Sequence, residues 1–209
     1  MEVTMTLTLY SHPMSRGRMA RWMLEEVGQP YEVVYLDYGT SMKAPGYLAL
    51  NPMGKVPALV HDGHVVTECA AVIAYLADAF PQAGLMAPDR AAFYRWMFFG
   101  AGPFEAAVTN RALGVEVPPE KAGFVGYGGF DRVLDTLDAT LSARDWLAGD
   151  GFSAADLYVG SQLGYGLVFG TLPARASFTA YWNRIKDRPA RLRASALDDA
   201  ALAKAKQNG

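Results

Sequence analysis

The 209-residue sequence contains only one cysteine, Cys69. One cysteine cannot form an internal disulfide, a zinc site with several thiolates or a Cys-x-x-Cys redox pair. Any thiol chemistry therefore involves Cys69 or a thiol that a ligand brings. The sequence also lacks a run of about 20 apolar residues, the length that a membrane-spanning helix needs. Met1 to Tyr10 lacks the pattern of a signal peptide, so we expect a cytoplasmic protein with no membrane partner.

The chain also has no large excess of positive or negative charge, and it contains few histidines. The 19 Lys and Arg residues and 21 Asp and Glu residues give a formal net charge of -2. Both signs are mixed along the chain, which leaves no basic face for nucleic acid. His12, His61 and His64 do not show a metal-ligand spacing with neighbouring acids, so we expect no metal site.

Hydrophobic residues, by contrast, make up 51% of the chain, enough for a sizeable core. In the first half, short β-type runs alternate with helical periodicity in the order β-α-β, loop, β-β-α. We expect Thr67 to cap the second helix. The predicted strands and helices are Val3–Tyr10, Ser15–Val27, Tyr31–Leu36, Val56–Val60, Val65–Val66 and Glu68–Phe80.

The second half has helical periodicity and no β pattern. Pro81 to Pro88, with Gly84 between prolines, is typical of a linker. We therefore expect an α/β domain over residues 1–81, a linker over 82–89 and an all-α domain over 90–209. Its predicted helices are Arg90–Leu113, Pro119–Ala143, Ala154–Phe169 and Phe178–Lys186.

The run from Asn51 to Pro57 places a proline at the entrance to a strand. A Val56–Pro57 bond at such a bend is a candidate cis peptide, which would turn the backbone N–H and C=O of Val56 outward to pair with an extended peptide. The alternative is a simple turn before an edge strand.

Glu68 and Cys69 lie at the predicted start of a helix, eleven residues after Pro57. A helix start binds carboxylates through its backbone N–H groups and its dipole, and the Glu68 side chain could hold an ammonium group. These are the two charges of an amino-acid head group. The alternative is that Glu68 only balances the dipole of its own helix.

Three further motifs lie at Leu9–Arg18, Ser153–Asp156 and Arg188–Ala190. In this order and spacing, the five motifs resemble the bacterial cytosolic glutathione S-transferases, in particular those of serine type. The resemblance runs from about Thr6 to about Ala194. It implies a thioredoxin-like N-terminal domain, an all-helical C-terminal domain, a homodimer and an active site between the domains.

The resemblance also assigns the binding of glutathione, the co-substrate. It implies that Val56 pairs its backbone with the cysteinyl part, that Pro57 is cis, and that Glu68 holds the γ-glutamyl ammonium group. Cys69 stands where the family usually has serine, and its backbone N–H would bind the γ-glutamyl carboxylate while its thiol is a poorer donor than a hydroxyl. Lys43 and Lys55 would lie near the glycyl end, unless they are solvated surface residues.

The group that activates the glutathione thiol is predicted to be Ser15, at the start of the first helix. A free thiol has a pKa near about 8.5, so a hydrogen-bond donor and a helix start are needed to raise the thiolate fraction. Tyr10, Ser11 and His12 are competitors, and Ser15 could instead cap the helix. Arg16 and Arg18 would add positive potential, although Arg18 in such a position more often pairs with a carboxylate.

The resemblance implies a detoxifying transferase (EC 2.5.1.18-like) that attaches glutathione to an apolar electrophile, with Phe99 and Phe104 bordering the electrophile site. One alternative is a glutathione-dependent peroxide or disulfide reductase. Another is a non-catalytic ligand- or partner-binding protein of the same fold. The identity of the electrophile does not follow from the sequence.

Overall fold

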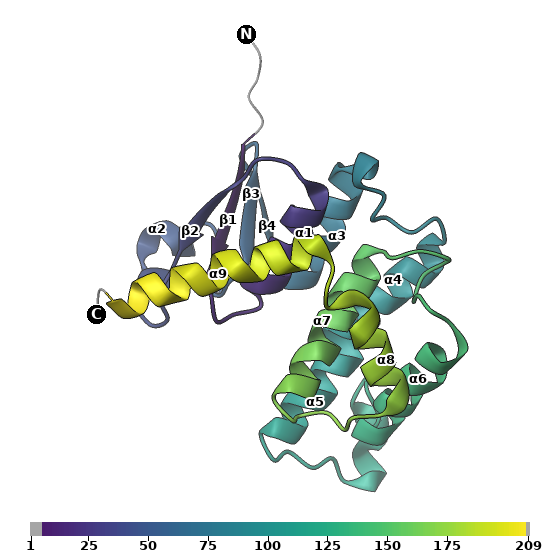
Figure 1. The fold of residues 1–209 in the computed structure, drawn as a ribbon. Helices are drawn as coiled ribbons and strands as arrows, with labels where there is room; N and C mark the ends of the chain where they lie inside the picture. The colour runs from purple at the N-terminus through teal and green to yellow at the C-terminus, as the bar shows by residue number, and fades with distance from the viewer. Residues whose placement is uncertain (1–5, 208–209) are drawn as a thin grey trace. The chain divides into compact units, whose positions relative to one another are not determined.

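The computed structural model describes residues 6–207. The chain forms two compact units (Figure 1). Unit 1 contains the chain up to Ala83 together with the segment from Arg188 onward, and unit 2 contains Gly84–Asp187. The contacts thus join residues from 188 onward to the first unit, whereas the sequence boundaries predicted for the domains group them with the helical half.

Unit 1 is built on a four-stranded sheet in the order β2-β1-β3-β4. β1 pairs with β2 in parallel, while the β1–β3 and β3–β4 pairs are antiparallel. The turn between β3 and β4 has two residues with positive φ, as a tight hairpin turn requires. This is the expected β-α-β, β-β-α order, although residues 3–5 of the first predicted strand lie outside the described residues. The strands are β1 (Leu7–Ser11), β2 (Glu32–Tyr35), β3 (Ala58–His61) and β4 (His64–Thr67).

The two faces of this sheet are covered by different helices. α1 (Gly17–Val27) and α3 (Cys69–Ala79) pack against each other and against β1 and β3. Tyr10 faces the other way, into a cluster with Tyr47 of the short helix α2 (Pro45–Leu48) and with Met42 of the 3-10 turn Ser41–Lys43. Successive residues of β1 therefore serve different faces.

The starts of α1 and α3 differ from the predicted positions. α1 begins at Gly17 with Arg16 at its N-cap, so Ser15 precedes the cap. α3 begins at Cys69 with Glu68 at its N-cap. Thr67 ends β4 and does not cap the helix. The hairpin register gives Thr67 a partner in β3 and extends the strand by one residue beyond the predicted end.

A long C-terminal helix, α9 (Pro189–Gln207), packs along α1 (Figure 1). Its buried residues are Ala190, Ala194 and Asp198, at a spacing of four. Two small alanines and one aspartate do not make an apolar stripe, which explains why hydrophobic periodicity does not predict this helix.

Unit 2 is helical, as expected, with a core of aromatic side chains. α7 is its most buried helix. The Ser153–Asp156 motif caps its start, because Oδ2 of Asp156 accepts hydrogen bonds from the N–H and hydroxyl of Ser153. The predicted helix over 119–143 is divided by a glycine-containing segment, and only its second part is α-helical. The helices are α4 (Arg90–Phe99), α5 (Glu105–Ala112), α6 (Phe130–Ala143), α7 (Ala154–Val168) and α8 (Ala176–Ile185).

A π-helical turn, Gly100–Phe104, joins α4 to α5. Phe104 is fully buried and lies 6.4 Å from the Phe99 ring, measured between centroids. Phe104 is therefore a core residue here and does not line an open site, in contrast to its expected place beside the electrophile.

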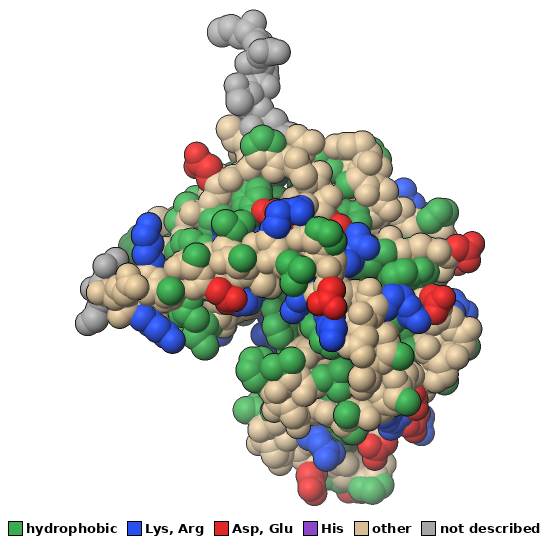
Figure 2. All heavy atoms as spheres, viewed as in Figure 1, with side chains coloured by type: hydrophobic (Ala, Val, Ile, Leu, Met, Phe, Trp, Pro, Cys, Tyr) green, Lys and Arg blue, Asp and Glu red, His purple; other side chains and the backbone are tan. Residues whose placement is uncertain are grey.

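Within residues 6–207, no helix is both long and apolar enough to cross a membrane. Acidic and basic side chains are interspersed over the face that Figure 2 shows. This mixture agrees with the near balance of charges in the sequence.

Candidate functional site

The Val56–Pro57 peptide bond is cis, as the sequence predicts. The peptide before Val56 is fixed from behind, because the carbonyl of Lys55 accepts hydrogen bonds from Tyr47 Oη at 2.5 Å and Asn51 Nδ2 at 2.8 Å. In the described part of the chain, no hydrogen bond engages the N–H or C=O of Val56. Both groups are therefore available to an extended ligand.

Tyr47 and Asn51 are supporting residues that the sequence reasoning did not identify. Asn51 is 3% exposed, and its Oδ1 also accepts from the N–H of Met53 at 3.1 Å. Burial raises the pKa of the Tyr47 hydroxyl, which keeps this group a neutral donor to Lys55. Asn51 belongs to the Asn51–Pro57 motif and could have been found there, whereas no sequence signal marks Tyr47.

Lys43 and Lys55 belong to the same loop region but differ in their contacts. The ammonium group of Lys43 donates to the carbonyl of Gly54 at 2.9 Å and to that of Met53 at 3.3 Å. Lys43 therefore braces the loop before Val56, whereas the side chain of Lys55 is exposed.

Glu68 forms the junction between β4 and α3 in a backbone conformation that non-glycine residues rarely adopt, with φ of 66° and ψ of 120°. Such a conformation costs on the order of 1–3 kcal/mol and is often found at binding sites. The exposed Glu68 side chain does not cap α3. A carboxylate and the positive end of a helix thus lie side by side, as the head-group hypothesis requires.

The thiol of Cys69 is buried and directed toward α1. Its Sγ donates to the carbonyl of Arg16 at 3.5 Å and lies 4.0 Å from Met19 Sδ. The backbone N–H of Cys69 belongs to the first turn of α3, at the positive end of that helix. The Arg16 contact also brings the starts of α1 and α3 together.

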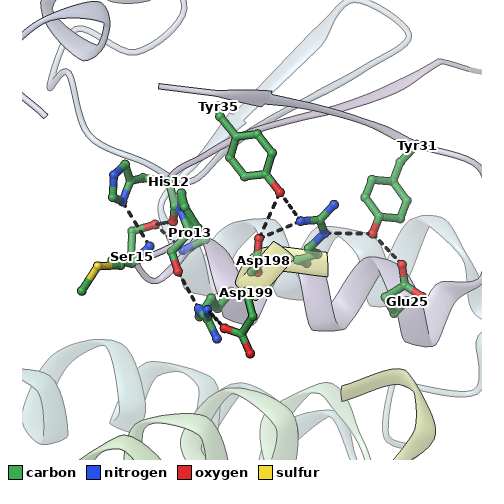
Figure 3. Close-up of polar contacts among 12 residues, drawn as sticks. His12, Pro13, Ser15, Glu25, Tyr31, Tyr35, Asp198 and Asp199 are labelled. Atoms are coloured by element: carbon green, nitrogen blue, oxygen red, sulfur yellow. Dashed lines mark hydrogen bonds and ion pairs between the residues drawn. The ribbon is translucent and has the colours of Figure 1, made fainter. Parts of the chain in front are cut away.

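Ser15 lies in a turn between β1 and α1. Its hydroxyl donates to the carbonyl of His12 at 2.7 Å and accepts from the N–H of Gly17 at 2.9 Å (Figure 3). Ser15 therefore stabilises the entry to α1 even though it precedes the N-cap. The side chain is half-buried, and its hydroxyl lies at the positive end of the helix.

The other three candidates for thiol activation, Ser11, Tyr10 and His12, have different surroundings. Ser11 is 1% exposed, and within residues 6–207 its hydroxyl has no hydrogen-bond partner. It lies beneath Gly17, where a Cβ would be 2.0 Å from its Oγ. Tyr10 packs on the opposite face of the sheet, with its ring centroid 5.5 Å from that of Tyr47.

His12 shares the turn with Ser15 and is held by neighbours. Its Nδ1 accepts from the N–H of Met14 at 3.1 Å, so the proton of the neutral ring is on Nε2. The ring lies 4.4 Å from that of Tyr38, whose hydroxyl donates to the carbonyl of Met14 at 3.2 Å. His12 thus stabilises the conformation of the turn.

No group of three or more His, Cys, Asp or Glu side chains among the described residues is arranged to hold a metal ion. Most of the predicted site residues lie in three short segments of unit 1, whereas Lys43 belongs to the 3-10 turn Ser41–Lys43 and Tyr10 packs on the opposite face of the sheet. The three segments are the turn before α1, the loop that ends at cis-Pro57 and the junction before α3. Together they offer backbone hydrogen bonds, one exposed carboxylate and two helix starts.

Comparison with known proteins identifies the family of this chain. Residues 5–78 match the family model "Glutathione S-transferase, N-terminal domain", and residues 126–189 match "Glutathione S-transferase, C-terminal domain". Glutathione S-transferase GST-4.5 of Xanthomonas campestris is 33% identical over 163 residues, which cover 73% of this chain and 79% of that protein.

Solved structures give the same result. A glutathione transferase from Methylococcus capsulatus has a TM-score of 0.76 at 30% identity, covering 93% of this chain and 99% of that one. A sphingomonad glutathione S-transferase complexed with glutathione has a TM-score of 0.74 at 29% identity, covering 92% and 98%. The thioredoxin-like sheet with an all-helical second half is therefore confirmed, and the chain belongs to the glutathione S-transferase family.

Proposed function

We propose that this chain binds reduced glutathione on unit 1 and attaches it, through its thiolate sulfur, to an apolar electrophile. The observation that carries the proposal is the cis-Val56–Pro57 bond, which presents unpaired backbone groups near the start of α3. The similar sphingomonad enzyme is complexed with glutathione. A tripeptide with an extended backbone fits recognition by addition to a sheet edge.

The charges of glutathione have matching partners on unit 1. Glu68 would hold the γ-glutamyl ammonium group, and the backbone N–H of Cys69 would bind the neighbouring carboxylate at the positive end of α3. Val56 would pair its backbone with the cysteinyl part. Lys55 is the better candidate for the glycyl carboxylate, because the Lys43 ammonium group already donates to two loop carbonyls.

Ser15 is proposed to stabilise the thiolate. Its hydroxyl would turn its proton from the carbonyl of His12 to the bound sulfur while still accepting from the N–H of Gly17. Because this hydroxyl and the positive end of α1 would stabilise the thiolate, the pKa of the bound glutathione thiol would lie below its usual value of about 8.5. The protein thus supplies orientation and charge stabilisation, and the sulfur displaces the leaving group of the electrophile.

The reductase alternative receives less support from the residues. A reductase that used Cys69 itself would need an accessible thiol, yet Sγ of Cys69 is buried against Arg16 and Met19. Reduction by bound glutathione would instead consume a hydroperoxide or disulfide faster than it conjugates an aryl halide. The non-catalytic alternative predicts ligand binding without turnover, so a turnover assay distinguishes it from a transferase. A homodimer, a cytoplasmic location and a role in detoxification are proposed from the family resemblance.

Calorimetric titration with reduced glutathione tests the proposal. We expect the unaltered protein to bind, Glu68→Gln to weaken binding strongly, and Ser15→Ala to keep most of the affinity but to turn over an aryl halide much more slowly. The pH profile of kcat/KM for Ser15→Ala would shift toward the pKa of free glutathione. Binding without turnover in the unaltered protein would favour the non-catalytic alternative, and absence of binding would overturn the proposal.

A further inference from the structure

The turn that carries Ser15 is held by its backbone carbonyls, three of which accept hydrogen bonds from side chains. The carbonyl of His12 accepts from Ser15 itself. The carbonyl of Pro13 accepts from Arg18 Nε at 2.5 Å, and that of Met14 accepts from Tyr38 Oη at 3.2 Å. The position of the Ser15 hydroxyl therefore depends on side chains outside the turn.

Arg18 connects this turn to a distant part of the sequence. Its Nε bonds to Pro13, and its Nη2 forms an ion pair with Asp199 of α9 (Figure 3). The Arg18 side chain is 23% exposed and that of Asp199 is 65% exposed. One guanidinium group thus bonds at the same time to the turn and to the C-terminal helix.

α9 is fixed along α1 by further ion pairs. Arg21 Nη1 lies 2.7 Å from Asp198 Oδ1, and Arg193 Nε lies 3.0 Å from Glu25 Oε2. Arg188 bonds to both carboxylate oxygens of Glu26, at 2.6 and 2.8 Å. These contacts set the position of α9 along α1 and therefore the place of the Asp199 carboxylate.

We propose that Asp199, acting through Arg18, is a positioning residue for the turn that presents Ser15. The inference rests on the proposed role of Ser15 in stabilising the thiolate. Arginine has a long side chain with several rotatable bonds, and the Asp199 carboxylate restricts it to the conformation that bonds to Pro13. Loss of Asp199 lets the turn move, and a small displacement of a reacting group lowers the rate substantially.

The pKa of the bound thiol distinguishes positioning from a simple charge effect. If Asp199 acted only as a charge, its removal would leave the site more positive and lower the thiol pKa. If it positions the turn, its removal weakens the hydrogen bond from Ser15 and raises the thiol pKa. The other charged or titratable groups around this end of α1 are unchanged in the variant; they are His12, Arg16, Arg18, Tyr38, Glu68, Cys69 and Asp198.

The experiment compares Asp199→Ala with Arg193→Ala in the full-length chain. Arg193 is the matched control because it also forms an exposed ion pair between α9 and α1, with Glu25, but does not bond to the turn. The measurements are the pH dependence of kcat/KM with glutathione and an aryl halide, and calorimetric affinity for glutathione. Hydrogen exchange of the Met14 and Ser15 amides provides a measurement independent of activity.

For Asp199→Ala we expect kcat/KM to fall by about threefold or more, with a raised thiol pKa and nearly unchanged affinity. Asp199→Asn, which keeps an acceptor for Arg18, should restore part of the rate. Arg193→Ala should keep the pH profile. A lowered or unchanged thiol pKa in Asp199→Ala, or an effect equal to that of Arg193→Ala, would overturn the proposal.

Failure of the proposed function would be visible separately, as absence of turnover in the unaltered protein. Positioning is then decided by hydrogen exchange alone. Faster exchange at Met14 and Ser15 in Asp199→Ala than in Arg193→Ala would support it, and equal exchange would contradict it.

Discussion

At the scale of single residues, the start of α1 depends on the absence of a side chain at position 17. The Ser11 hydroxyl occupies the space where a Cβ of residue 17 would be, at 2.0 Å, and the Ser15 hydroxyl is 2.9 Å from the same point. Only glycine brings the helix this close to the end of β1 without a clash. The same contact encloses the hydroxyl of Ser11.

We predict that Gly17→Ala is destabilising, although alanine is the better helix former. The clash with Ser11 should lower the free energy of unfolding by about 1–3 kcal/mol, as in other overpacked sites. Urea unfolding measures the change. Gly17→Ala combined with Ser11→Gly should recover most of the loss, and equal loss in the two backgrounds would show that the contact with Ser11 is not the cause.

The sequence predicts some residues of the candidate site better than others, and the reason is physical. Pro57 restricts its own peptide bond, so the cis bond follows from a local motif. The support of Lys55 by Tyr47 comes from packing between segments and has no local pattern. Likewise, side chains along β1 alternate between the two faces of the sheet, so Tyr10 and Ser11 lie on opposite faces. Which of the two approaches the start of α1 depends on the residue at which the strand ends.

At the scale of helices, the contact between α1 and α9 contains a buried ion pair. The Arg21 and Asp198 side chains are 9% and 1% exposed, and Arg21 also donates to the hydroxyls of Tyr31 and Tyr35. Burial raises the pKa of Asp198. Burial alone would lower the pKa of Arg21, but the Tyr31 hydroxyl and Asp198 raise it above its ordinary value. The native state therefore depends on both partners being present.

We predict that Asp198→Ala lowers the free energy of unfolding by about 3 kcal/mol, because it leaves a buried guanidinium without its carboxylate. Replacing both partners, Arg21→Met with Asp198→Leu, should restore much of this stability. Chemical denaturation of the single and double variants gives the coupling energy. If the double variant is as unstable as the sum of the single variants, packing rather than charge dominates at this contact.

This pair also explains why the sequence does not reveal α9. Helix prediction relies on apolar residues at helical spacing, and the buried positions of α9 contain alanine and aspartate. The partner of Asp198 lies 177 residues away, at Arg21. In contrast, helical periodicity predicts α7, and the Ser153–Asp156 contact at its start is local in sequence.

At the scale of the whole molecule, several tyrosine hydroxyls that are at least partly shielded from solvent link stability to alkaline pH. Burial, together with a hydrogen bond to Glu25, raises the pKa of Tyr31 from 10.0 to about 12. Burial also raises the pKa of Tyr35, Tyr47 and Tyr181. A raised pKa in the folded state means that the unfolded chain loses these protons first as pH rises.

We therefore predict that the stabilisation from the neutral Tyr31 hydroxyl is complete below pH 10 and is lost as the pH rises toward 12. Urea unfolding at increasing pH measures the slope. Tyr31→Phe should reduce the slope above pH 10, whereas Tyr94→Phe, a change in an exposed ring, should not. Equal slopes in the two variants would contradict a contribution from Tyr31.

The last prediction concerns how the two ends of the chain combine in unit 1. The segment from Arg188 onward packs on α1 although unit 2 separates it from the N-terminal sheet in sequence. Truncation after Asp187 should therefore destabilise unit 1 by exposing buried residues of α1, including Arg21 and Trp22. We expect hydrogen exchange to increase in α1 and β1 and to remain nearly unchanged in α7. Greater exchange in α7 than in α1 would mean that the C-terminal segment stabilises the helical unit, as the sequence boundaries alone imply.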